Sequence, residues 1–588
     1  MIAILTDKPS IGKVIGRAIG ATKVRNGYME GNGYMVTWTF GNMISLAMPK
    51  DYGMERMERK DFPFIPSEFR LTVRHVRTET GWIPDIEAVL QLKTIKKVLE
   101  MCDTIISAME AGRDGEMAFR YIYQHLGCTQ PCLRLWISSL TDEAVRKGME
   151  NLEPDSLYDG LFLSADSRNK ADWLLGVNAS YAICKATGLG NNSLGRVQTP
   201  VLAAISRRYR ERENHISTDT WPIYINLQKD NVLFKMRCAE DYSDKEIASM
   251  FYQDCKLTGT ARITKIARHE QEIQPPALFN FTDLQIYAGK HHGMTAMEVY
   301  DITQVLYEKK LITYPRTTSR HIPQDVYEYL PAILARLSDW KLFPETESSV
   351  SPDLQPGGTV NESEKRNHHA IIITGIRPEG LKEKEMQVYR LIAGRMMEAF
   401  MPPCLMETVT VEAICAAQVF TTVNNRVIHK GWKEVFWNTT STKEGNITDN
   451  IPELKEGELI KVSGCNLVHK KQLPVCPFTD AELLEYMEQC NLGTVTSRTS
   501  IIRTLLERKY IRYSGKYIVP TPKGMFTYET IRNKKIADVL LTVNLESNLN
   551  KVQIGEISQE MFLQTIKLLT KEITDDIFNT YTPQQDIK

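Results

Sequence analysis

The sequence lacks several features that would each indicate a particular class of protein. No stretch approaches about 18 uninterrupted apolar residues, which argues against a membrane-spanning helix. The N-terminal residues MIAILTDKPS lack the basic start and the long apolar run of a signal peptide. The eleven cysteines are scattered, and because no CxxC pair of zinc knuckles occurs, we expect no structural zinc. These absences predict a reduced, cytoplasmic protein that does not enter a membrane.

Two further absences concern nucleotides and charge. The chain contains no GxxxxGKS or GxxxxGKT loop, so we expect no ATP site of the P-loop kind. Lys plus Arg and Asp plus Glu both total 72, so the net charge gives the protein no general attraction to a phosphate backbone. Any nucleic-acid surface must therefore come from local segregation of charge.

At 588 residues the chain is too long for a single hydrophobic core, and several domains are expected. Apolar residues make up 42% and charged residues 24%, both near the averages for globular proteins, so the chain should be folded almost throughout. The first part, residues 1–150, predicts an α/β domain with a parallel sheet. There, strand-like runs at 2–6 (IAILT) and 103–108 (DTIISA) each precede a helical segment. Acidic residues at the carboxyl ends of such strands belong to the edge that binds ligands.

The rest of the chain alternates between helical and β patterns. Residues 151–212 and 471–588 are mostly helical in pattern. Residues 213–274 and 401–470 contain alternating stretches, such as WPIYINLQ and METVTVEAICA, that are typical of β-structure. Residues 275–400 are helical again. We interpret this order as a helical domain inserted into a β domain that holds it at both ends, within a multidomain chain of α/β, α and β parts.

The segment KKLITYPRTTSR combines Tyr314 with Arg316 two residues later. Pro315 disfavours an ordinary helix through this point. A tyrosine hydroxyl can attack phosphorus to give a phosphotyrosine, provided that the phosphate charge is stabilised and the leaving hydroxyl is protonated. Arg316 can supply a forked pair of donors to one phosphate. Alone this pair carries little weight, because the chain has 24 tyrosines and a tyrosine near an arginine is usually structural.

Other segments strengthen the functional interpretation of Tyr314 and Arg316, because they match segments of a known protein family in the same order along the chain. The matching segments are LITYPRTTS, SLGRVQTPVL at 193–202, ADWLLGVN at 171–178, RLWISSLTDEAV at 134–145, PPALFNFTDLQ at 275–285, HHAIIITG at 368–375 and LGTVTSRTSIIRTLLERKYI at 492–511. On these segments the chain resembles the type IA DNA topoisomerases, of the topoisomerase III kind. The resemblance implies a toroidal core made of a Toprim domain, helical domains and a β arch.

The resemblance also places a group of residues along bound single-stranded DNA. Arg196 can bind a phosphate, Gln198 can bind a base edge or a phosphate, and Gly195 allows close approach of the backbone. Asp172 can read a base edge and Trp173 can stack on a base, although core packing is the alternative for Trp173. The DNA-binding residues expected from the match are Ser193, Leu194, Gly195, Arg196, Val197, Gln198, Arg168, Asp172 and Trp173.

The Toprim domains of the family hold Mg²⁺ near the scissile phosphate through a set of acids. The four positions match Asp7, Glu110, Gly112 and Asp114, and Glu116 follows them. Relative to the family, three of these positions exchange Asp with Glu, and Gly112 has lost its carboxylate. The expected metal ligands are Asp7, Glu110, Asp114 and Glu116. Because Mg²⁺ tolerates poor octahedral geometry badly, both a working and a weakened site are open.

Two basic residues complete the implied catalytic set. Lys8 is expected at the scissile phosphate, where it would stabilise charge and transfer a proton to the leaving 3′ oxygen; a salt bridge to the acids is the alternative. His368 is expected to polarise a phosphate or to steady the leaving group. The catalytic residues implied are Tyr314, Arg316, Lys8, Asp7 and His368. Tyr181 is a further departure, because the family commonly has Arg there and one phosphate contact is then missing.

The resemblance implies two reversible transesterifications without ATP. Tyr314 would form a 5′-phosphotyrosyl link, another strand would pass through the gap, and the break would be religated, which relaxes negative supercoils or decatenates circles. The alternative is a single-stranded-DNA-binding clamp whose cleavage is weakened or lost through the altered acids. We expect a monomer that acts on single-stranded regions of DNA, with a helicase as a candidate partner. The end at TPQQDIK, without the cysteine knuckles that many type IA enzymes append, resembles a minimal topoisomerase III, including versions carried by mobile elements.

Overall fold

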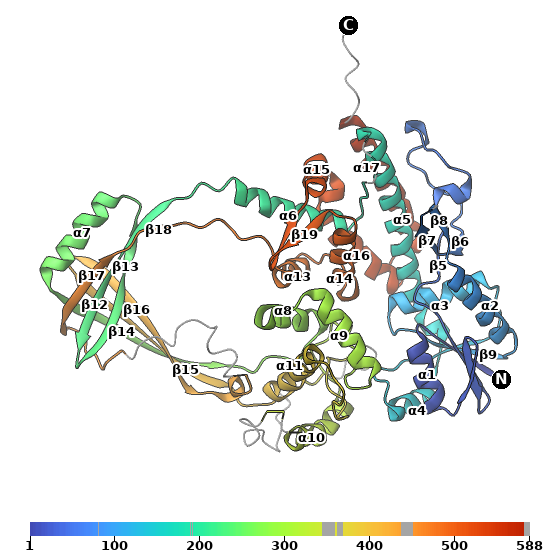
Figure 1. Cartoon of the computed structure of the whole chain (residues 1–588), viewed down its shortest axis with the longest axis horizontal. Coiled ribbons are helices and arrows are strands. Elements are labelled where there is room, and N and C mark those ends of the chain that lie inside the picture. The colour runs from blue at the N-terminus through green and yellow to red at the C-terminus, as the bar shows by residue number, and fades with distance from the viewer. Residues whose placement is uncertain are drawn as a thin grey trace, which may run out of the picture.

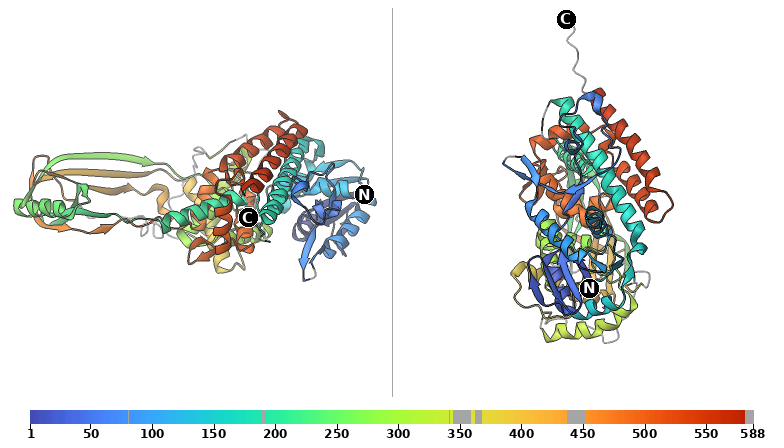
Figure 2. Two further views of the ribbon diagram at one scale, coloured as in Figure 1. Left: turned by 90° about the horizontal axis from the view of Figure 1, so that it is seen from above. Right: turned by 90° about the vertical axis from the view of Figure 1, so that its right-hand side faces the viewer.

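The computed structural model describes residues 1–79, 81–188, 190, 192–340, 342–343, 359–361, 368–436 and 451–580. The elements form a ring, with the N-terminal sheet on the right, long antiparallel strands on the left and helices between them (Figure 1). Seen from above, the long strands extend well away from the rest of the molecule (Figure 2). None of the helices in these ranges is long and apolar enough to cross a membrane. The predicted combination of α/β, α and β parts is confirmed.

The N-terminal sheet has the order β11-β10-β9-β1-β4-β3-β2. Its parallel strands are β1 (Ile2–Thr6), β4 (Tyr34–Trp38), β9 (Thr104–Ala108) and β10 (Cys132–Arg134). Its antiparallel edge strands are β2 (Lys23–Arg25), β3 (Tyr28–Gly31) and β11 (Glu153–Pro154). Two small hairpins lie outside it, β5 (Ile44–Leu46) with β6 (Leu71–Val73), and β7 (His75–Thr78) with β8 (Gly81–Pro84).

Helices cover both faces of this sheet, because successive side chains of a strand point to opposite sides. The helices are α1 (Pro9–Ala18), α2 (Ile86–Glu100), α3 (Arg113–His125) and α4 (Asp142–Glu150). Ile4 and Ile106 pack in one core with residues of α1 and α4, whereas Leu5 and Ile105 pack in another with residues of α2 and α3. The buried, β-branched strands found in the sequence are therefore the centre of a three-layer α/β unit.

This topology brings two acids to one edge of the sheet. Asp7 follows β1 directly, and Glu110 lies two residues beyond the end of β9. The two strands are parallel neighbours, and Thr6 pairs with Ala108 at their carboxyl ends. The side chains that follow these strands therefore meet at the edge where such sheets bind ligands.

The long strands on the left of Figure 1 form one antiparallel sheet, which we call the arch. Its order is β13-β16-β15-β14-β17-β12-β18, with a further pairing of β13 with β12 that closes it. Its elements are β12 (Asp219–Lys229), β13 (Val232–Tyr242), α7 (Lys245–Thr258), β14 (Thr260–Ile273), β15 (Cys404–Cys415), β16 (Gln418–His429), β17 (Leu459–Leu467) and β18 (Lys470–Lys471). The strands come from both segments in which the sequence predicted β-structure, while helix α7 was not predicted.

The helical parts of the ring come from three stretches of the chain. The first contains α5 (Asp159–Thr187) and α6 (Gln198–Glu213). The middle one contains α8 (Phe281–His292), α9 (Ala296–Glu308), α10 (Gln324–Asp339) and α11 (Glu383–Ala399). The last contains α13 (Asp480–Gln489), α14 (Val495–Glu507), β19 (Ile511–Ser514), β20 (Tyr517–Pro520), α15 (Pro522–Ile531), α16 (Val539–Gln553) and α17 (Gln559–Thr580). Helix α5 packs against α3, α16 and α17, and so connects the sheet to the end of the chain.

The segment that carries Tyr314 runs between α9 and α10 without a helix, as Pro315 leads one to expect. Ile312 forms an isolated β-bridge with Ile373, and the backbone N–H of Thr313 donates to the carbonyl oxygen of Ile372 over 2.9 Å. These backbone contacts, in a densely buried part of the molecule, fix the loop that presents the tyrosine.

Candidate active site

Tyr314 faces the acid edge of the N-terminal sheet. Its backbone N–H donates to the carbonyl oxygen of Ser138 over 2.8 Å, and its side chain is only 7% exposed. The ring centroid lies 4.2 Å from that of His368 and 5.5 Å from that of Tyr307. The hydroxyl of Tyr314 donates a hydrogen bond to Oε1 of Glu110. The predicted nucleophile and one predicted acid, about 200 residues apart in sequence, are thus in direct contact.

Arg316 contacts the same carboxylate. Its Nη1 lies 3.0 Å from Oε2 of Glu110, and its Nη2 donates to Oε1 of Gln304 over 3.0 Å. The guanidinium carbon also lies 4.8 Å from the ring centroid of Tyr300. In this conformation Glu110 therefore takes up guanidinium donors that a phosphate would use.

Burial and the charges of the site keep Tyr314, the predicted nucleophile, protonated. Burial, and next the carboxylate of Glu110, raise the pKa of Tyr314 well above its ordinary value, and Arg316 offsets only part of this effect. Burial and the facing Glu110 also raise the pKa of Asp7 to about 6, against the opposing influence of Lys8. Tyr314 therefore holds its proton at neutral pH, whereas Asp7 can gain or lose one close to neutrality.

His368 supports the ring of Tyr314 as a neutral imidazole. Its Nε2 lies 2.9 Å from the carbonyl oxygen of Ala111, and its Nδ1 lies 3.2 Å from Oγ of Ser138. Burial lowers the pKa of His368 to about 3, so the side chain is uncharged across the physiological range. It can orient Tyr314 and exchange hydrogen bonds with a phosphate, but in this conformation it brings no positive charge.

Two cavities meet at Glu110. The inner one, of about 30 Å³, is lined by Tyr314 and His368, and the outer one, of about 860 Å³, by Lys8. Asp7, Glu110 and Arg316 line both. Nζ of Lys8 lies 3.7 Å from a carboxylate oxygen of Glu308 on α9, rather than in a close ion pair with the acids. Glu110 thus lies between the outer cavity and the hydroxyl of Tyr314.

The remaining predicted acids are held by arginines. Asp114 forms an ion pair with Arg168 of α5. Glu116 is fully buried, with Oε1 3.0 Å from Nε of Arg120 and Oε2 3.6 Å from Nε of Arg134. It lines neither cavity, which corrects the prediction that Glu116 is a metal ligand. The physical reason is helix geometry, because residues two apart on a helix face different sides and only Asp114 faces the outer cavity.

Asp7 and Glu110 are left as the acids that face each other. Within the described ranges, no three His, Cys, Asp or Glu side chains are grouped so that they could hold a metal ion. Mg²⁺ usually keeps several waters and takes one or two carboxylates together with substrate phosphates. Asp7 and Glu110 fit a site of that kind, since burial and then the repulsion between the two carboxylates raise the pKa of Asp7, and a cation would relieve both. Gly112 adds no ligand, and a Cβ built there would meet no atom within 4 Å.

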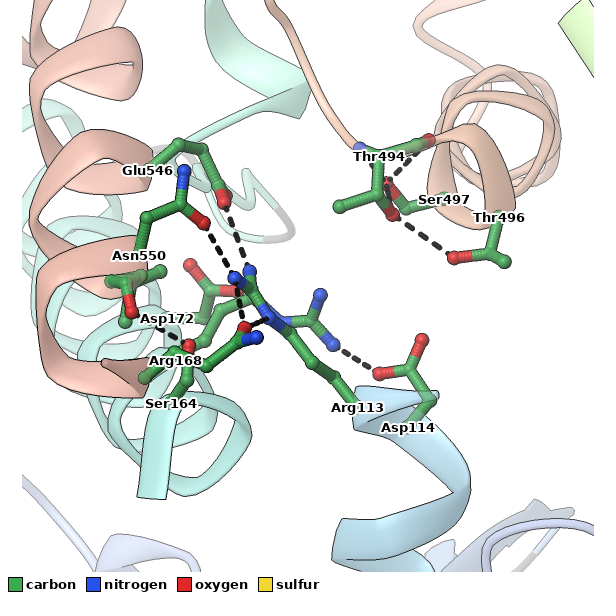
Figure 3. A network of polar contacts seen from close by, with 12 residues as sticks. Arg113, Asp114, Ser164, Arg168, Asp172, Thr494, Thr496, Ser497, Glu546 and Asn550 are labelled. Carbon is green, nitrogen blue, oxygen red and sulfur yellow. Dashed lines mark hydrogen bonds and ion pairs between the residues drawn. The ribbon is translucent and has the colours of Figure 1, made fainter. Parts of the chain in front are cut away.

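The outer cavity is a groove between α5, the segment before α6 and the start of α14, and both charged and apolar residues line it. Of the predicted DNA-binding residues, all but Trp173 line it, namely Arg168, Asp172, Ser193, Leu194, Gly195, Arg196, Val197 and Gln198. Figure 3 shows Arg168 reaching Asp114 on one side of the space, with Thr494, Thr496 and Ser497 of the α14 N-terminus across from them. We call this cavity the groove.

Arg196 is tied down by two carboxylates in the groove wall. Its Nε lies 2.7 Å from Oδ1 of Asp172 and its Nη2 lies 2.8 Å from Oε1 of Glu546. Its Nη1 is buried and has no hydrogen-bond partner in the part of the chain that the structure describes. One guanidinium nitrogen is thus uncommitted, while the other two fix the orientation of the side chain.

Trp173 lies in the core instead of the groove. Its side chain is 8% exposed, and its ring packs against Phe64 and Phe69 at centroid distances of 6.1 and 5.5 Å. This position corrects the prediction that Trp173 stacks on a base. Trp173 follows Asp172 on α5, and neighbouring residues on a helix point about 100° apart, so the aspartate faces the groove and the tryptophan faces inward.

Sequence reasoning missed two residues of the groove. Arg508 donates from Nη1 to Oγ of Ser193 and to Oε1 of Gln198, both over 2.8 Å. It lies within the segment LGTVTSRTSIIRTLLERKYI, which carried a signal, but no role was assigned to it. Glu546 on α16 had no signal in the sequence, because its importance comes only from its contact with Arg196.

Comparisons with known proteins agree with this geometry. A family model described as DNA topoisomerase matches residues 156–564. DNA topoisomerase 3 of Bacillus cereus is 30% identical, over 98% of this chain and 81% of that protein, and DNA topoisomerase 3 of Bacillus subtilis is 31% identical, over 98% and 82%. Full-length topoisomerase I from Thermotoga maritima has a similar fold, with a TM-score of 0.75 at 20% identity, over 97% of this chain and 90% of that chain. The predicted toroidal fold class is confirmed, and the chain belongs to the DNA topoisomerase family, as a type IA member similar to DNA topoisomerase 3 of bacteria.

Proposed function

We propose that the protein cuts one strand of single-stranded DNA with Tyr314, lets another strand pass and rejoins the cut without ATP. The observation that carries this proposal is the contact of Tyr314 and Arg316 with Glu110, which joins a nucleophile, a phosphate-binding group and a proton acceptor. Relaxation of negative supercoils and decatenation both use this chemistry.

The cleavage step follows from the positions of these groups. A phosphodiester would displace Glu110 from Arg316, and Oη of Tyr314 would attack phosphorus while its proton passes to Glu110. The bond from phosphorus to the 3′ oxygen breaks, and that oxygen takes a proton from the ammonium group of Lys8, which lines the outer cavity together with Asp7. The products are a 5′-phosphotyrosine and a 3′ hydroxyl, and religation is the reverse. Lys8, at the mouth of the site, would stabilise the phosphate charge.

We further propose that Mg²⁺ is bound weakly between Asp7 and Glu110, without help from Glu116. When bound, the ion would supply positive charge beside the scissile phosphate. Asp114 would stay with Arg168 in the groove wall, because its ion pair there is already formed. Weak binding is expected, since Gly112 provides no carboxylate.

The groove is the proposed path of the single strand. Arg168, Arg196 and Gln198 would contact phosphates or base edges, with Arg508 and the α14 N-terminus opposite. In the absence of DNA the first two arginines are paired with Asp114 and Asp172, so a strand must exchange these partners for its own phosphates. This exchange favours a bound strand that makes several contacts at once.

Four parts of the chain are proposed to act as separate bodies in strand passage. These are the Toprim domain (1–150), the groove domain (151–212 and 471–588), the arch (213–274 and 401–470) and the helical domain with Tyr314 (275–400). The arch would act as the hinge on which the helical domain moves away from the Toprim domain. We also propose that the protein is cytoplasmic and monomeric, and a helicase partner remains a prediction.

The proposal is tested by mixing the full-length protein with a 5′-labelled or 3′-labelled single-stranded oligonucleotide and Mg²⁺. A covalent adduct should form with the label on the 3′ side of the break only, because the tyrosine holds the 5′ phosphate. Tyr314→Phe should give no adduct and Tyr307→Phe, its buried neighbour, should retain it. If no adduct forms with Mg²⁺, with Mn²⁺ or without metal while the oligonucleotide binds, the protein is a DNA-binding clamp and the proposal is wrong.

A further inference from the structure

Tyr181 is an exposed aromatic side chain that lines the groove. It lies near the end of α5 and lines the outer cavity together with Val177 and Ser180 of the same helix. Its side chain is 44% exposed, which is unusual for a ring on a helix that packs against three others. In the described part of the chain, Tyr181 has no hydrogen bond and no ring partner. Nothing in the fold accounts for a large apolar surface at this point.

Tyr300, the second aromatic residue lining the groove, differs from Tyr181 in this respect. The guanidinium carbons of Arg316 and Arg503 lie 4.8 and 5.7 Å from the ring centroid of Tyr300. Its ring is therefore covered by the protein's own cations. Among the described residues that line the groove, Tyr181 alone presents an uncovered aromatic ring.

The surroundings of Tyr181 are held rigidly. Oγ of Ser180 donates to the carbonyl oxygen of Gly176 over 2.5 Å and accepts from the backbone N–H of Leu194 over 2.8 Å, which fixes the loop before α6 against the helix. Gly176 has no side chain, and a Cβ there would approach only the carbonyl oxygen of Leu194, at 3.5 Å. The helix and the loop next to Tyr181 are thus held in place, and the exposed ring can receive a ligand without a large movement of either.

Positive charge lines the same groove. Arg508 reaches into it with Nη1 on Ser193 and Gln198, both hydrogen bonds being to neutral groups. Its charge is therefore not cancelled by a carboxylate in these contacts and is available to a phosphate. An aromatic face together with a cation in one groove is the arrangement by which proteins bind single strands without sequence preference, because every base has a face that can stack.

We propose that Tyr181 is a stacking platform for one base of the single strand, and that it replaces a phosphate contact by a base contact. The inference rests on the proposed function, since it needs a single strand in the groove. Helix rise places Tyr181 roughly 20 Å along α5 from Arg168, the residue that pairs with Asp114 near the acids. The stacked base therefore lies several nucleotides from the scissile phosphate, and stacking should be tolerant of base identity.

The experiment is an abasic scan of a single-stranded oligonucleotide, read by binding of the full-length protein in the uncleaving Tyr314→Phe background. For the protein with Tyr181, removal of one base at a single position several nucleotides from the cleavage site should weaken binding by roughly 5- to 150-fold. Tyr181→Ala and Tyr181→Leu should weaken binding of the intact strand to a similar degree and should abolish the penalty of the abasic position. Tyr181→Phe should keep both the affinity and the penalty, because the ring remains.

The control is Tyr329→Ala, which removes an exposed tyrosine of α10 that does not line the groove and should change nothing. If no abasic position distinguishes Tyr181→Ala from the parent, or if Tyr181→Phe behaves like Tyr181→Ala, the stacking proposal is overturned. Failure of the proposed function gives a different result, namely no binding of the intact strand by the parent, or no adduct with Tyr314 restored.

Discussion

Glu110 controls the resting state of the site at the scale of single residues. It accepts the hydrogen bond of the nucleophile, it pairs with the arginine expected to bind phosphate, and it raises the pKa values of both Tyr314 and Asp7. A family position expected to hold metal therefore adds to the effect of burial, which keeps the tyrosine protonated. Glu110 stands where the family has aspartate, and it is this longer side chain that contacts both Tyr314 and Arg316.

Glu110→Gln tests the role of the carboxylate as proton acceptor. The amide has nearly the same shape, but it cannot take the proton of Tyr314 and it no longer pairs with Arg316. We expect the single-turnover rate of adduct formation to fall by on the order of 10²-fold, with oligonucleotide binding kept or improved. Glu150→Gln, an exposed position at the end of α4, is the control. An unchanged rate in Glu110→Gln would assign proton acceptance to another group.

The raised pKa of Asp7 predicts a pH-dependent stability difference. Because the folded protein raises this pKa from 3.8 to about 6, stability contributed by protonated Asp7 is complete below pH 3.8 and is lost as the pH rises through about 6. Asp7→Asn has no such loss. Its unfolding free energy relative to the wild type should therefore increase between pH 4 and about 6, by at most about 3 kcal/mol, and then level off. Melting curves across this range would contradict the assignment if the difference fell.

The positions of some site residues could be predicted from the sequence and those of others could not, for physical reasons. Asp7 and Glu110 could be placed because they follow buried strands, whose parallel pairing brings their ends together. Glu116 and Trp173 could not, because a motif specifies which residues occur but not which side of a helix each faces once the helix is packed. Tyr314 was predicted because its segment and the other matching segments resemble a known family, while Pro315 indicated only that no ordinary helix passes through it.

At the scale of elements, side-chain hydrogen bonds and ion pairs join helices that are distant in sequence. Arg113 at the start of α3 donates to side chains of Asn550 and Gln553 on α16, and Arg196 before α6 bridges α5 and α16 through Asp172 and Glu546. The acid edge and the groove are therefore parts of one connected wall. The periodicity of a helix or strand does not indicate contacts between helices that are distant in sequence. For this reason the role of Glu546 was not predicted.

Arg196→Ala should weaken this wall. Removal of the nearly buried guanidinium takes away the cation that lies between the carboxylates of Asp172 and Glu546 and leaves Glu546 with the longer contact to Arg113, at 3.9 Å. We expect a loss of roughly 3 kcal/mol of unfolding free energy. Denaturant unfolding followed by tryptophan fluorescence would measure it. Arg210→Ala on α6 is the matched control, since its ion pair with Glu529 is exposed and should contribute less than about 1 kcal/mol. Equal effects of the two substitutions would contradict this account.

At the scale of the whole molecule, the ring closes where the helical domain meets the N-terminal sheet. The closing contacts include the hydrogen bond of Tyr314 to Ser138 and ion pairs between the two sides, Lys310 with Asp142 and Lys8 with Glu308. The predicted order of helical and β segments anticipated the arch. The sequence did not reveal which surfaces meet at the closure, because these contacts join residues from opposite ends of the ring.

Reversal of one ion pair at the closure should favour opening. Lys310→Glu places two negative charges together beside α4, and Asp142→Lys in the same protein restores an attractive pair of opposite sense. The single variant should open more often, by a factor of roughly 2–5, as judged by energy transfer between dyes on the helical and N-terminal sides, and the double variant should return toward the wild type. The effect should shrink at high salt. If the single and double variants opened equally often, the ion pair of Lys310 with Asp142 would not contribute to the closure.

The carboxylate that covers Tyr314 and Arg316 acts as a tethered competitor of the substrate. Being part of the chain, Glu110 is present beside the arginine at a high effective concentration, and a free nucleotide or a short phosphate ester must compete with it from dilute solution. Only a strand anchored at several points along the groove brings its phosphate there at a comparable effective concentration. In the proposed mechanism, the resting enzyme would be protected from reacting with the phosphate esters of the cell, and its selectivity for polymeric DNA would be present before any DNA arrives.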